Sequence, residues 1–382
     1  MRGHVGYKTT KSGKKSYFYK FTSPITGKDV MKRGFKTARD AADALAVALA
    51  SIVTGQYVEP CKTTLIEYVR KWFENHVLAR TSRAGYRNII ENHIARDPIA
   101  NMLVSKLQCS TIDDYYAGRR KAGLGDNTLK RHRAILRPVL DKAVHDELLK
   151  TNPERFCKLR KPRKYKATTY DEDQVAVMLE VFRGEEIYPA VLLAAFGALR
   201  RGENLGTTWA AFNPERNTLR INQAYYVVDG KAGYDDVKTE NSEDLVYLTD
   251  FAIGELKRIR KEQMKMKLQL GAAWQDNGLI CCQPDGSPWN PSTISHKFGD
   301  ALERHGLPHI RFHDLRHTHA TIMHENGADA KDIATMLRET PQVAAETYID
   351  MTAKRRRKLA DTFGQAIFGP KKNPRRKRGS QG

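Results

Sequence analysis

Hydrophobic and polar positions near the N-terminus favour first strands and then a helix. Residues 16–21 are rich in strand-favouring aromatic residues, and residues 30–35 have the composition of a returning strand. Thr37 can cap a helix that runs from residue 38 to about residue 52. We therefore expect residues 1–58 to form a small α+β domain, with a three-stranded sheet and one helix.

Helical spacing dominates residues 63–157. An apolar stripe on the first helix is formed by Leu65, Tyr68, Val69, Trp72 and Phe73. Further helices are predicted over residues 80–93, from Ser110, and after Asn127, which can serve as a cap. The last of these helices has apolar residues on one face and basic residues on the other. This segment should fold as a compact all-α domain.

The remaining sequence predicts a larger, mainly α-helical domain of the α+β class over residues 168–369. Helices are expected over residues 171–182, 187–196, 250–268, 312–324 and 330–337. Alternation over residues 219–228 predicts a strand that leads into an Asp-Gly hairpin turn. A basic linker over residues 158–167 precedes this domain, and a basic, disordered tail over residues 370–382 follows it. The chain is thus predicted to be a multidomain protein.

The charge balance is the first indication of function. The chain has 65 Lys and Arg residues against 44 Asp and Glu residues, a formal net charge of +21 and a pI near 9.7. This excess favours a polyanionic partner, and nucleic acid explains it better than an anionic membrane. No apolar stretch approaches the roughly 20 residues that span a bilayer. The five scattered cysteines are expected to be reduced thiols in a cytoplasmic protein.

Basic residues gather at three places that could contact a nucleic-acid backbone. In the N-terminal domain the candidates, which include aromatic residues, are Lys14, Lys15, Tyr17, Tyr19, Lys32 and Arg33. On the outer face of the last helix of the all-α domain they are Lys130, Arg131 and Arg133. In the linker they are Lys158, Arg160, Lys161, Arg163 and Lys164. Each group could instead be a solvated basic surface, although wrapping around a duplex suits the linker at least as well.

Five residues with related chemistry lie far apart in the last domain: Arg200, Lys238, His313, Arg316 and Tyr348. A guanidinium binds two phosphoryl oxygens at once, and a phenol can hold a phosphoryl group covalently. Lysine and histidine are the usual proton carriers. Each residue alone has an ordinary structural explanation, but together they indicate phosphoryl transfer through a phosphotyrosine. The sequence has no Gly-x-x-x-x-Gly-Lys-Ser/Thr loop and no clear acidic metal cluster, so we expect no ATP, metal or other cofactor.

The order and spacing of these residues are specific as a set. Leu-Arg-Arg-Gly-Glu occupies residues 199–203, and His-Asp-Leu-Arg-His-Thr occupies residues 313–318. With the hairpin lysine and the tyrosine, the pattern resembles the catalytic domain of the tyrosine recombinases, the lambda-integrase family, over about residues 168–365. The whole layout resembles phage and conjugative-element integrases, with an arm-site DNA-binding domain, a helical core-binding domain and a catalytic domain. The N-terminal part of this resemblance is looser than the catalytic part.

The resemblance implies a catalytic role for each of the five residues. Arg200 and Arg316 would grip the non-bridging oxygens of the scissile phosphate. Tyr348 would attack the phosphorus, which gives a 3′-phosphotyrosine and frees a 5′-hydroxyl. Lys238 would protonate the leaving oxygen, and His313 would assist proton transfer. Because the covalent link conserves the energy of the broken bond, rejoining would need no ATP.

Two acidic residues complete the predicted site. Glu203 would hold Arg200 through an ion pair. Glu339 departs from the family pattern, which usually has Leu-Gly followed by histidine or tryptophan nine residues before the tyrosine; here that stretch is Leu337-Arg338-Glu339. An ionised carboxylate would repel a phosphate. Either Arg338 supplies the hydrogen-bond donor, or Glu339 is protonated or turned away, or the enzyme is slower.

As a whole, the resemblance implies a site-specific recombinase that integrates and excises a mobile element. Its partner would be double-stranded DNA, bound by a homotetramer at core and arm sites in the cytoplasm of a bacterial host, near the nucleoid. A host DNA-bending protein and an excisionase would be further partners. The same chemistry could serve a resolvase-like or transposase role. The alternative from another class is a catalytically weak or inactive DNA-binding protein that retains the fold, and Glu339 favours it.

Overall fold

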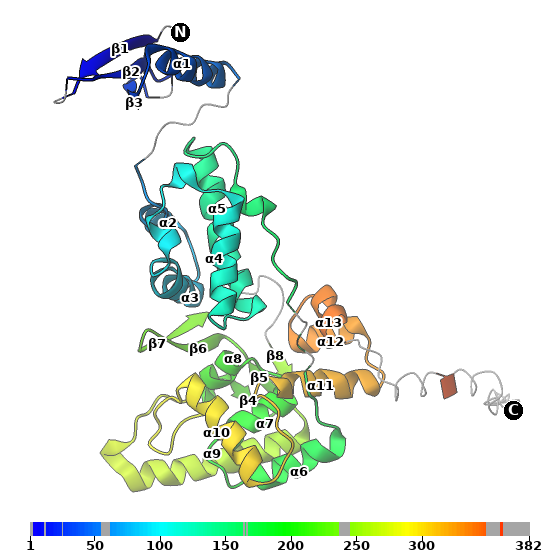
Figure 1. Ribbon diagram of the computed structural model, residues 1–382. Helices are drawn as coiled ribbons and strands as arrows, with labels where there is room; N and C mark the ends of the chain where they lie inside the picture. The colour runs from blue at the N-terminus through cyan, green and yellow to red at the C-terminus, as the bar shows by residue number, and fades with distance from the viewer. Residues whose placement is uncertain are drawn as a thin grey trace, which may run out of the picture. The chain divides into compact units, whose positions relative to one another are not determined.

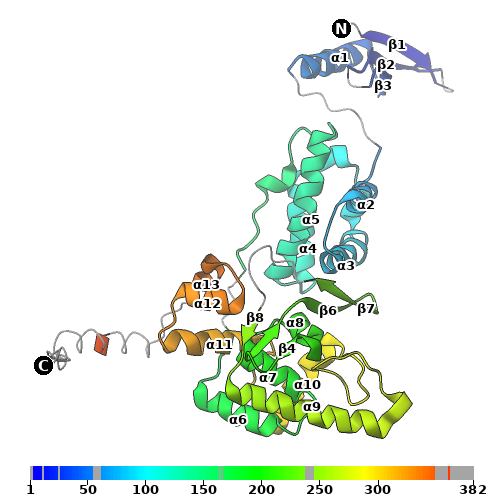
Figure 2. The same ribbon diagram turned by 180° about the vertical axis from the view of Figure 1, so that it is seen from behind.

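The computed structural model describes residues 3–10, 13–24, 26–54, 62–162, 165, 167–236, 245–348 and 360–361, with residues 236 and 346–348 described by their backbone alone. The chain divides into two compact units, Met1–Lys164 and Tyr165–Gly382. Figures 1 and 2 show the helices and strands from opposite sides. Each unit has a hydrophobic core of its own. The finer domain limits predicted above stay predictions.

A three-stranded antiparallel sheet opens the first unit. Its strands, in the order in which they pair, are β1 (His4–Thr9), β2 (Lys15–Thr22) and β3 (Asp29–Phe35). Helix α1 (Ala38–Val53) follows the predicted cap Thr37 and packs on the sheet. Tyr19 and Phe21 of β2 meet Leu45 of α1 in a small core. The predicted sheet with one helix is confirmed.

Helices make up most of the rest of the first unit. They are α2 (Leu65–Asn75), α3 (Arg80–Ile89), α4 (Cys109–Lys121) and α5 (Asp126–His145). The apolar stripe predicted for α2 is buried, apart from a partly buried Trp72. The predicted cap of the last helix was wrong, because α5 begins one residue before Asn127 and Gly125 takes the N-cap position. The predicted all-α character is confirmed.

The second unit is mainly α-helical, as predicted. Its described helices are α6 (Glu172–Phe182), α7 (Tyr188–Gly197), α8 (Arg201–Gly206), α9 (Asp250–Leu270), α10 (Pro291–Arg304), α11 (Asp314–Glu325), α12 (Ala330–Leu337) and α13 (Pro341–Tyr348). Helices α8 and α10 were not predicted. Helix α8 is short, and α10 begins with proline at its first position, where the missing N–H costs nothing.

The strands of the second unit form two separate sheets within the described residues. One sheet contains β4 (Phe212–Asn213), β5 (Thr218–Arg220) and β8 (Leu245–Tyr247), and the other is a hairpin of β6 (Gln223–Val228) and β7 (Lys231–Asp236). Asp229 and Gly230 turn the hairpin with φ of 51° and 73°, as its turn type requires. The single strand predicted over residues 219–228 was wrong, because the chain leaves the first sheet after Arg220 and joins the second at Gln223.

Helices α11, α12 and α13 lie together at one side of the second unit in both views (Figures 1 and 2). A small buried cluster joins them to the end of α7; its members are Ala198, Ala320, Ile333, Ala334, Leu337 and Ala344. Four of these six residues are alanines, and their small side chains let the helices approach closely. The ends of α7 and α12 therefore come near the first turn of α11. Within the described residues, no helix combines the length and apolarity needed to cross a membrane.

Candidate active site

Arg316 is the most deeply buried member of the predicted site, with 1% of its side chain exposed. It lies in the first turn of α11, where its Nη1 donates to the carbonyl oxygen of Ala198 at 2.6 Å. Its Nη2 donates to the carbonyl oxygen of Leu337 at 2.5 Å. Ala198 is the C-cap of α7, and Leu337 is the last residue of α12. Carbonyl groups at the C-terminal end of a helix lack partners within that helix. Two helix C-termini, each with partial negative charge, therefore fix this guanidinium.

Arg200 approaches the same place from the start of α8, with 42% of its side chain exposed. Its Nη1 donates to Oε1 of Glu203 at 2.8 Å, and its main-chain N–H donates to Oε2 of Glu203 at 3.0 Å. Nη2 of Arg338 donates to the same Oε2 at 2.6 Å. Burial alone would raise the pKa of Glu203, but Arg338 and Arg200 lower it. The predicted pairing of Arg200 with Glu203 is present, and Arg338 joins it.

Glu339 connects the two arginines that were predicted to hold the phosphate. Its Oε1 accepts Nη2 of Arg316 at 2.7 Å and Nη2 of Arg200 at 3.1 Å. The two guanidinium groups therefore converge on a single oxygen atom. The sequence left open that Glu339 is turned away from the site. The structure does not show this state, because Glu339 faces both arginines.

His313 precedes α11 and lies beside His317. The two imidazole rings meet edge to face, with centroids 5.3 Å apart and an interplanar angle of 89°. Loss of hydration, His317 and Arg316 lower the pKa of His313, so its imidazole is neutral near neutral pH. A neutral imidazole beside a cluster of guanidinium groups can accept a proton.

A buried acid that was not predicted as a site residue orients the start of α11. Asp314 accepts the Nη2 group of Arg311 at 2.9 Å, the main-chain N–H of Arg311 at 2.9 Å and the hydroxyl of Tyr165 at 2.9 Å. These contacts place the helix turn that contains Arg316. Its position inside the His-Asp-Leu-Arg-His-Thr motif is the signal that could have identified Asp314.

The predicted proton donor and nucleophile are not tested by the structure. Lys238 belongs to residues 237–244, which lie outside the described part of the chain. Tyr348 is the last residue of α13, and its side chain also lies outside the described part. The structure thus brings together Arg200, Glu203, Arg316 and Glu339, with His313 beside Arg316.

Comparison with known proteins identifies the family of the second unit. Residues 169–355 match the model of the phage integrase family. The chain therefore contains a phage integrase family domain. It is a tyrosine-type site-specific recombinase. A tyrosine recombinase XerC-like protein of Caldanaerobacter subterraneus subsp. tengcongensis is similar to it, with 25% identity over 94% of this chain and 98% of the relative.

Solved structures confirm the fold of the recombinase. The Tn1549 transposon integrase in complex with a circular intermediate DNA has a TM-score of 0.66, covers 78% of this chain and 99% of its own, and is 15% identical. A lambda integrase tetramer bound to a Holliday junction has a TM-score of 0.54, covers 87% of this chain and 93% of its own, and is 17% identical. The predicted multidomain class with a mainly α-helical catalytic domain is confirmed.

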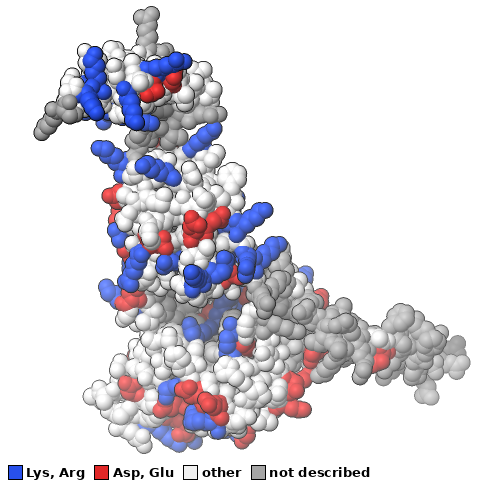
Figure 3. All heavy atoms as spheres, viewed as in Figure 1, with Lys and Arg blue, Asp and Glu red and all other residues white. Residues whose placement is uncertain are grey.

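Most of the predicted DNA contacts of the recombinase are exposed; these are Lys14, Lys15, Lys32, Arg33, Lys130, Arg131, Lys158, Arg160 and Lys161. Figure 3 shows basic side chains over the N-terminal sheet and α1 at the top of the view. Tyr19 is buried, and burial raises its pKa, so it serves the core of the sheet. Arg163 and Lys164 lie outside the described residues.

Arg133 is engaged inside the helical core of the recombinase. The buried carboxylate of Glu154 pairs with Arg133 and accepts Nε of Arg137 at 2.6 Å. Arg133 also donates Nη2 to the carbonyl oxygen of Cys157 at 2.5 Å. Burying a carboxylate is costly unless such partners compensate for its lost hydration. The guanidinium of Arg133 therefore has a structural role besides the predicted contact with DNA.

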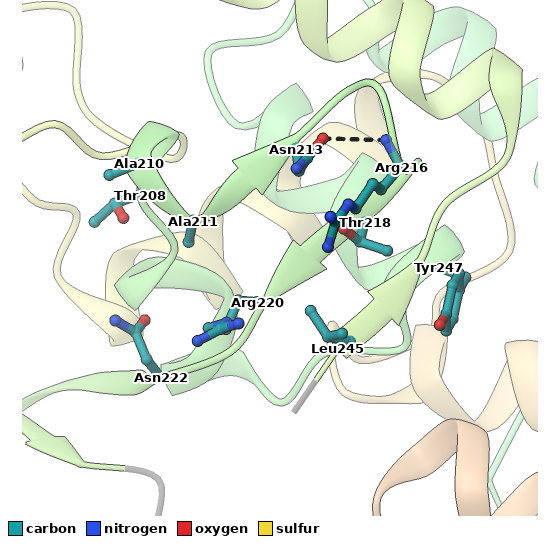
Figure 4. A pocket seen from close by; sticks show the side chains of 10 residues that line it. All are labelled: Thr208, Ala210, Ala211, Asn213, Arg216, Thr218, Arg220, Asn222, Leu245 and Tyr247. Carbon is teal, nitrogen blue, oxygen red and sulfur yellow. Dashed lines mark hydrogen bonds between the residues drawn. The ribbon is translucent and has the colours of Figure 1, made fainter. Parts of the chain in front are cut away.

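Two other features do not include the predicted catalytic residues. A pocket of about 540 Å³ on the β4-β5-β8 sheet is lined by Arg216 and Arg220 among polar and small residues (Figure 4). Among the described residues, one group could hold a metal ion: Cys109, Asp113 and Cys157, with ligand atoms within 4.8 Å of one another. Their spacing in the sequence has no metal-binding signature. We assign this group no part in strand transfer.

Proposed function

We propose that the recombinase cuts and rejoins DNA through a covalent bond to Tyr348, and so integrates and excises a mobile element. One observation supports this proposal above the others: Arg200 and Arg316 direct their Nη2 groups at the same oxygen atom of Glu339. Two guanidinium groups that share one acidic oxygen are suited to a phosphate, which presents several oxygens of the same kind.

The proposed step is a displacement at phosphorus. The hydroxyl oxygen of Tyr348 forms a bond to the scissile phosphorus as the bond from phosphorus to the 5′ oxygen of DNA breaks. His313 assists removal of the phenolic proton, and Lys238 gives a proton to the 5′ oxygen. Attack by a 5′-hydroxyl on the phosphotyrosine reverses every bond change and rejoins the strand.

The arginines would act on the charge that develops during this step. Negative charge spreads over the equatorial oxygens of the transition state, and donors already in position stabilise it. Arg316 cannot move freely, because two helix ends hold its guanidinium. Arg200 is held less completely, through Glu203. Guanidinium charge close to the attacking phenol would also favour its phenolate form.

The proposal includes DNA partners and an assembly. A homotetramer would bind core sites through the helical part of the chain and arm sites through residues 1–58. The lambda integrase tetramer bound to a Holliday junction supports such an assembly by similarity of fold. The exposed basic residues on the first unit support the DNA contacts. A host DNA-bending protein and an excisionase remain proposed partners.

A covalent-trapping experiment tests the proposed function. The protein is mixed with a nicked duplex that carries its site, so that loss of the short cut fragment prevents rejoining. A protein–DNA adduct that resists denaturation should appear. The Tyr348→Phe variant should bind the duplex and form no adduct, because it lacks the hydroxyl oxygen.

The control for this experiment is Tyr247→Phe, since Tyr247 is an exposed tyrosine of the same unit with no proposed role in the reaction. This variant should form the adduct at the rate of the unaltered protein. An adduct of undiminished yield with Tyr348→Phe would show that the nucleophile has been misassigned. If the unaltered protein binds the duplex but forms no adduct at all, the inactive alternative is favoured.

A further inference from the structure

We propose that Glu339 occupies the place of the scissile phosphate in the DNA-free protein, and that arriving DNA displaces its carboxylate onto Arg338. The inference rests on the proposed function, because it takes Arg200 and Arg316 as the groups that bind the phosphate. It assigns Glu339 and Arg338 as positioning residues, which set how readily DNA reaches the two arginines.

The carboxylate of Glu339 is bonded to the two arginines that would bind the phosphate. Oε1 of Glu339 lies 2.7 Å from Nη2 of Arg316 and 3.1 Å from Nη2 of Arg200. These donors are the same ones that a non-bridging phosphate oxygen would need. Two anions cannot share one set of donors at hydrogen-bond distance, because their charges repel each other. The phosphate must therefore compete with a carboxylate that belongs to the chain itself.

Unpaired donors of Arg338 offer a place for the displaced carboxylate. Within the described residues, Nε and Nη1 of Arg338 are buried and have no hydrogen-bond partner, and neither does Oε2 of Glu339. Buried polar atoms are normally paired, so such exceptions call for a physical explanation. Here the unpaired atoms are donors on one residue and an acceptor on the next. Rotation of the Glu339 side chain would bring this acceptor to one of the two donors.

Arg338 is held in place before the exchange. Its Nη2 donates to Oε2 of Glu203 at 2.6 Å, and 10% of its side chain is exposed. Arg338 closes helix α12 in the left-handed region, with φ of 52° and ψ of 54°. A residue other than glycine is strained in this conformation. The ion pair with Glu203 offsets that strain.

The net charge of this cluster of arginines and glutamates equals the one that the usual family sequence would give. Arg200, Arg316 and Arg338 against Glu203 and Glu339 are three positive charges and two negative charges, which leaves one net positive charge. The usual family sequence would place glycine at position 338 and a neutral histidine at position 339. The cluster would then have two positive charges and one negative charge, which is the same net value. The Arg338–Glu339 pair therefore preserves the attraction for phosphate and adds an anion that must be moved.

Inorganic sulfate provides a test that requires no strand cleavage. Sulfate that binds the arginines stabilises the folded protein, so the rise in melting temperature reports its binding. Glu339→Gln should lower the half-saturating sulfate concentration at least ~10-fold, because the competing charge is gone. The matched control Glu303→Gln removes the same charge from an exposed position on α10 and should leave that concentration unchanged. Adding Arg200→Gln to Glu339→Gln should abolish the gain.

An unchanged half-saturating concentration in Glu339→Gln would overturn the inference. If this variant does not fold, Glu339→His serves instead, with the same expected gain. The sulfate and adduct measurements separate the failure of the inference from that of the proposed function: a sulfate gain without any Tyr348 adduct would contradict the recombination step alone. Normal adduct formation with no sulfate gain would contradict the displacement alone.

A double-mutant comparison tests the role of Arg338 as the receiving group. Arg338→Met keeps much of the side-chain volume but cannot pair with a displaced carboxylate. It should slow adduct formation when Glu339 is present and have no further effect in the Glu339→Gln protein, because the two residues would then act in one step. Equal slowing in both backgrounds would show that Arg338 only supports the structure, and the transfer of the carboxylate to it would be wrong.

Discussion

At the scale of single residues, main-chain carbonyl groups position the charged guanidinium of Arg316. Arg316 is fixed by the carbonyl oxygens of Ala198 and Leu337, and its distance from each is set by helices rather than by flexible side chains. Arg200 depends on an ionised Glu203. A site of this kind has its donors oriented before substrate arrives, which is the condition under which they stabilise a transition state most.

Lysine at position 316 should therefore be a poor substitute. It keeps the charge, but its single ammonium group cannot reproduce the planar fork that reaches two carbonyl groups and an acidic oxygen. Arg316→Lys should slow adduct formation at least ~100-fold in single-turnover measurements on the nicked duplex. Arg304→Lys, which alters an exposed arginine on α10, is the control and should react normally. A rate near that of the unaltered protein would exclude a transition-state role for Arg316.

The residues that the structure brings together at the candidate site, and the pairing of Arg200 with Glu203, were predicted from the sequence, but the partners of Arg316 were not. Arg200, Glu203, His313 and Arg316 stand in motifs whose spacing is informative. The bond from Arg316 to Leu337, in contrast, depends on where α12 ends. Arg338 ends it in a left-handed conformation that sequence rules assign first to glycine or asparagine.

At the scale of helices and strands, hydrophobic periodicity was most reliable where an element is long and half buried. The pattern predicted α9 and α11 to within about two residues. It failed where the chain changes partner without a change of pattern. The strand predicted over residues 219–228 is split between two sheets, because hydrogen bonds to β8 end at Arg220 and those to β7 begin at Gln223.

Leu337 contributes both to the packing of the helices and to the candidate site. Its side chain is buried among α11, α12 and α13, and its carbonyl oxygen accepts a hydrogen bond from Arg316. Leu337→Ala should destabilise the second unit by about 2–5 kcal/mol, through lost burial and the cavity that remains. Thermal unfolding of the purified protein measures this loss, and adduct formation should also slow. Leu268→Ala, at an exposed position of α9, should change the melting temperature little. Equal effects of the two changes would contradict the packing described for α12.

At the scale of the whole molecule, net charge overstates how many basic residues face a ligand. The chain carries a formal net charge of +21, yet Arg133 and Arg137 pair with a buried Glu154. By contrast, Lys14, Lys15, Lys32 and Arg33 of the N-terminal domain are exposed. Charge composition therefore predicted the class of partner, whereas the contribution of each basic residue could be assessed only after folding was known.

Removal of residues 1–58 should separate two DNA-binding functions. Binding to DNA with arm sites should weaken, and the dependence of that binding on salt concentration should become shallower, because fewer counterions are released. Adduct formation on a duplex with the core site alone should persist. Removal of residues 370–382 is the control, since this segment is also basic. Identical footprints on both kinds of DNA after the N-terminal deletion would reject the two-site proposal.

The left-handed end of α12 also bears on how this sequence can diverge. Glycine would suit the backbone at position 338, but that change alone would cancel the net positive charge of the cluster. A neutral residue at position 339 alone would raise the net charge of the cluster from one positive charge to two. Descendants of this chain should therefore alter the two neighbouring codons in concert, and lineages that carry only one of the two changes should be rare.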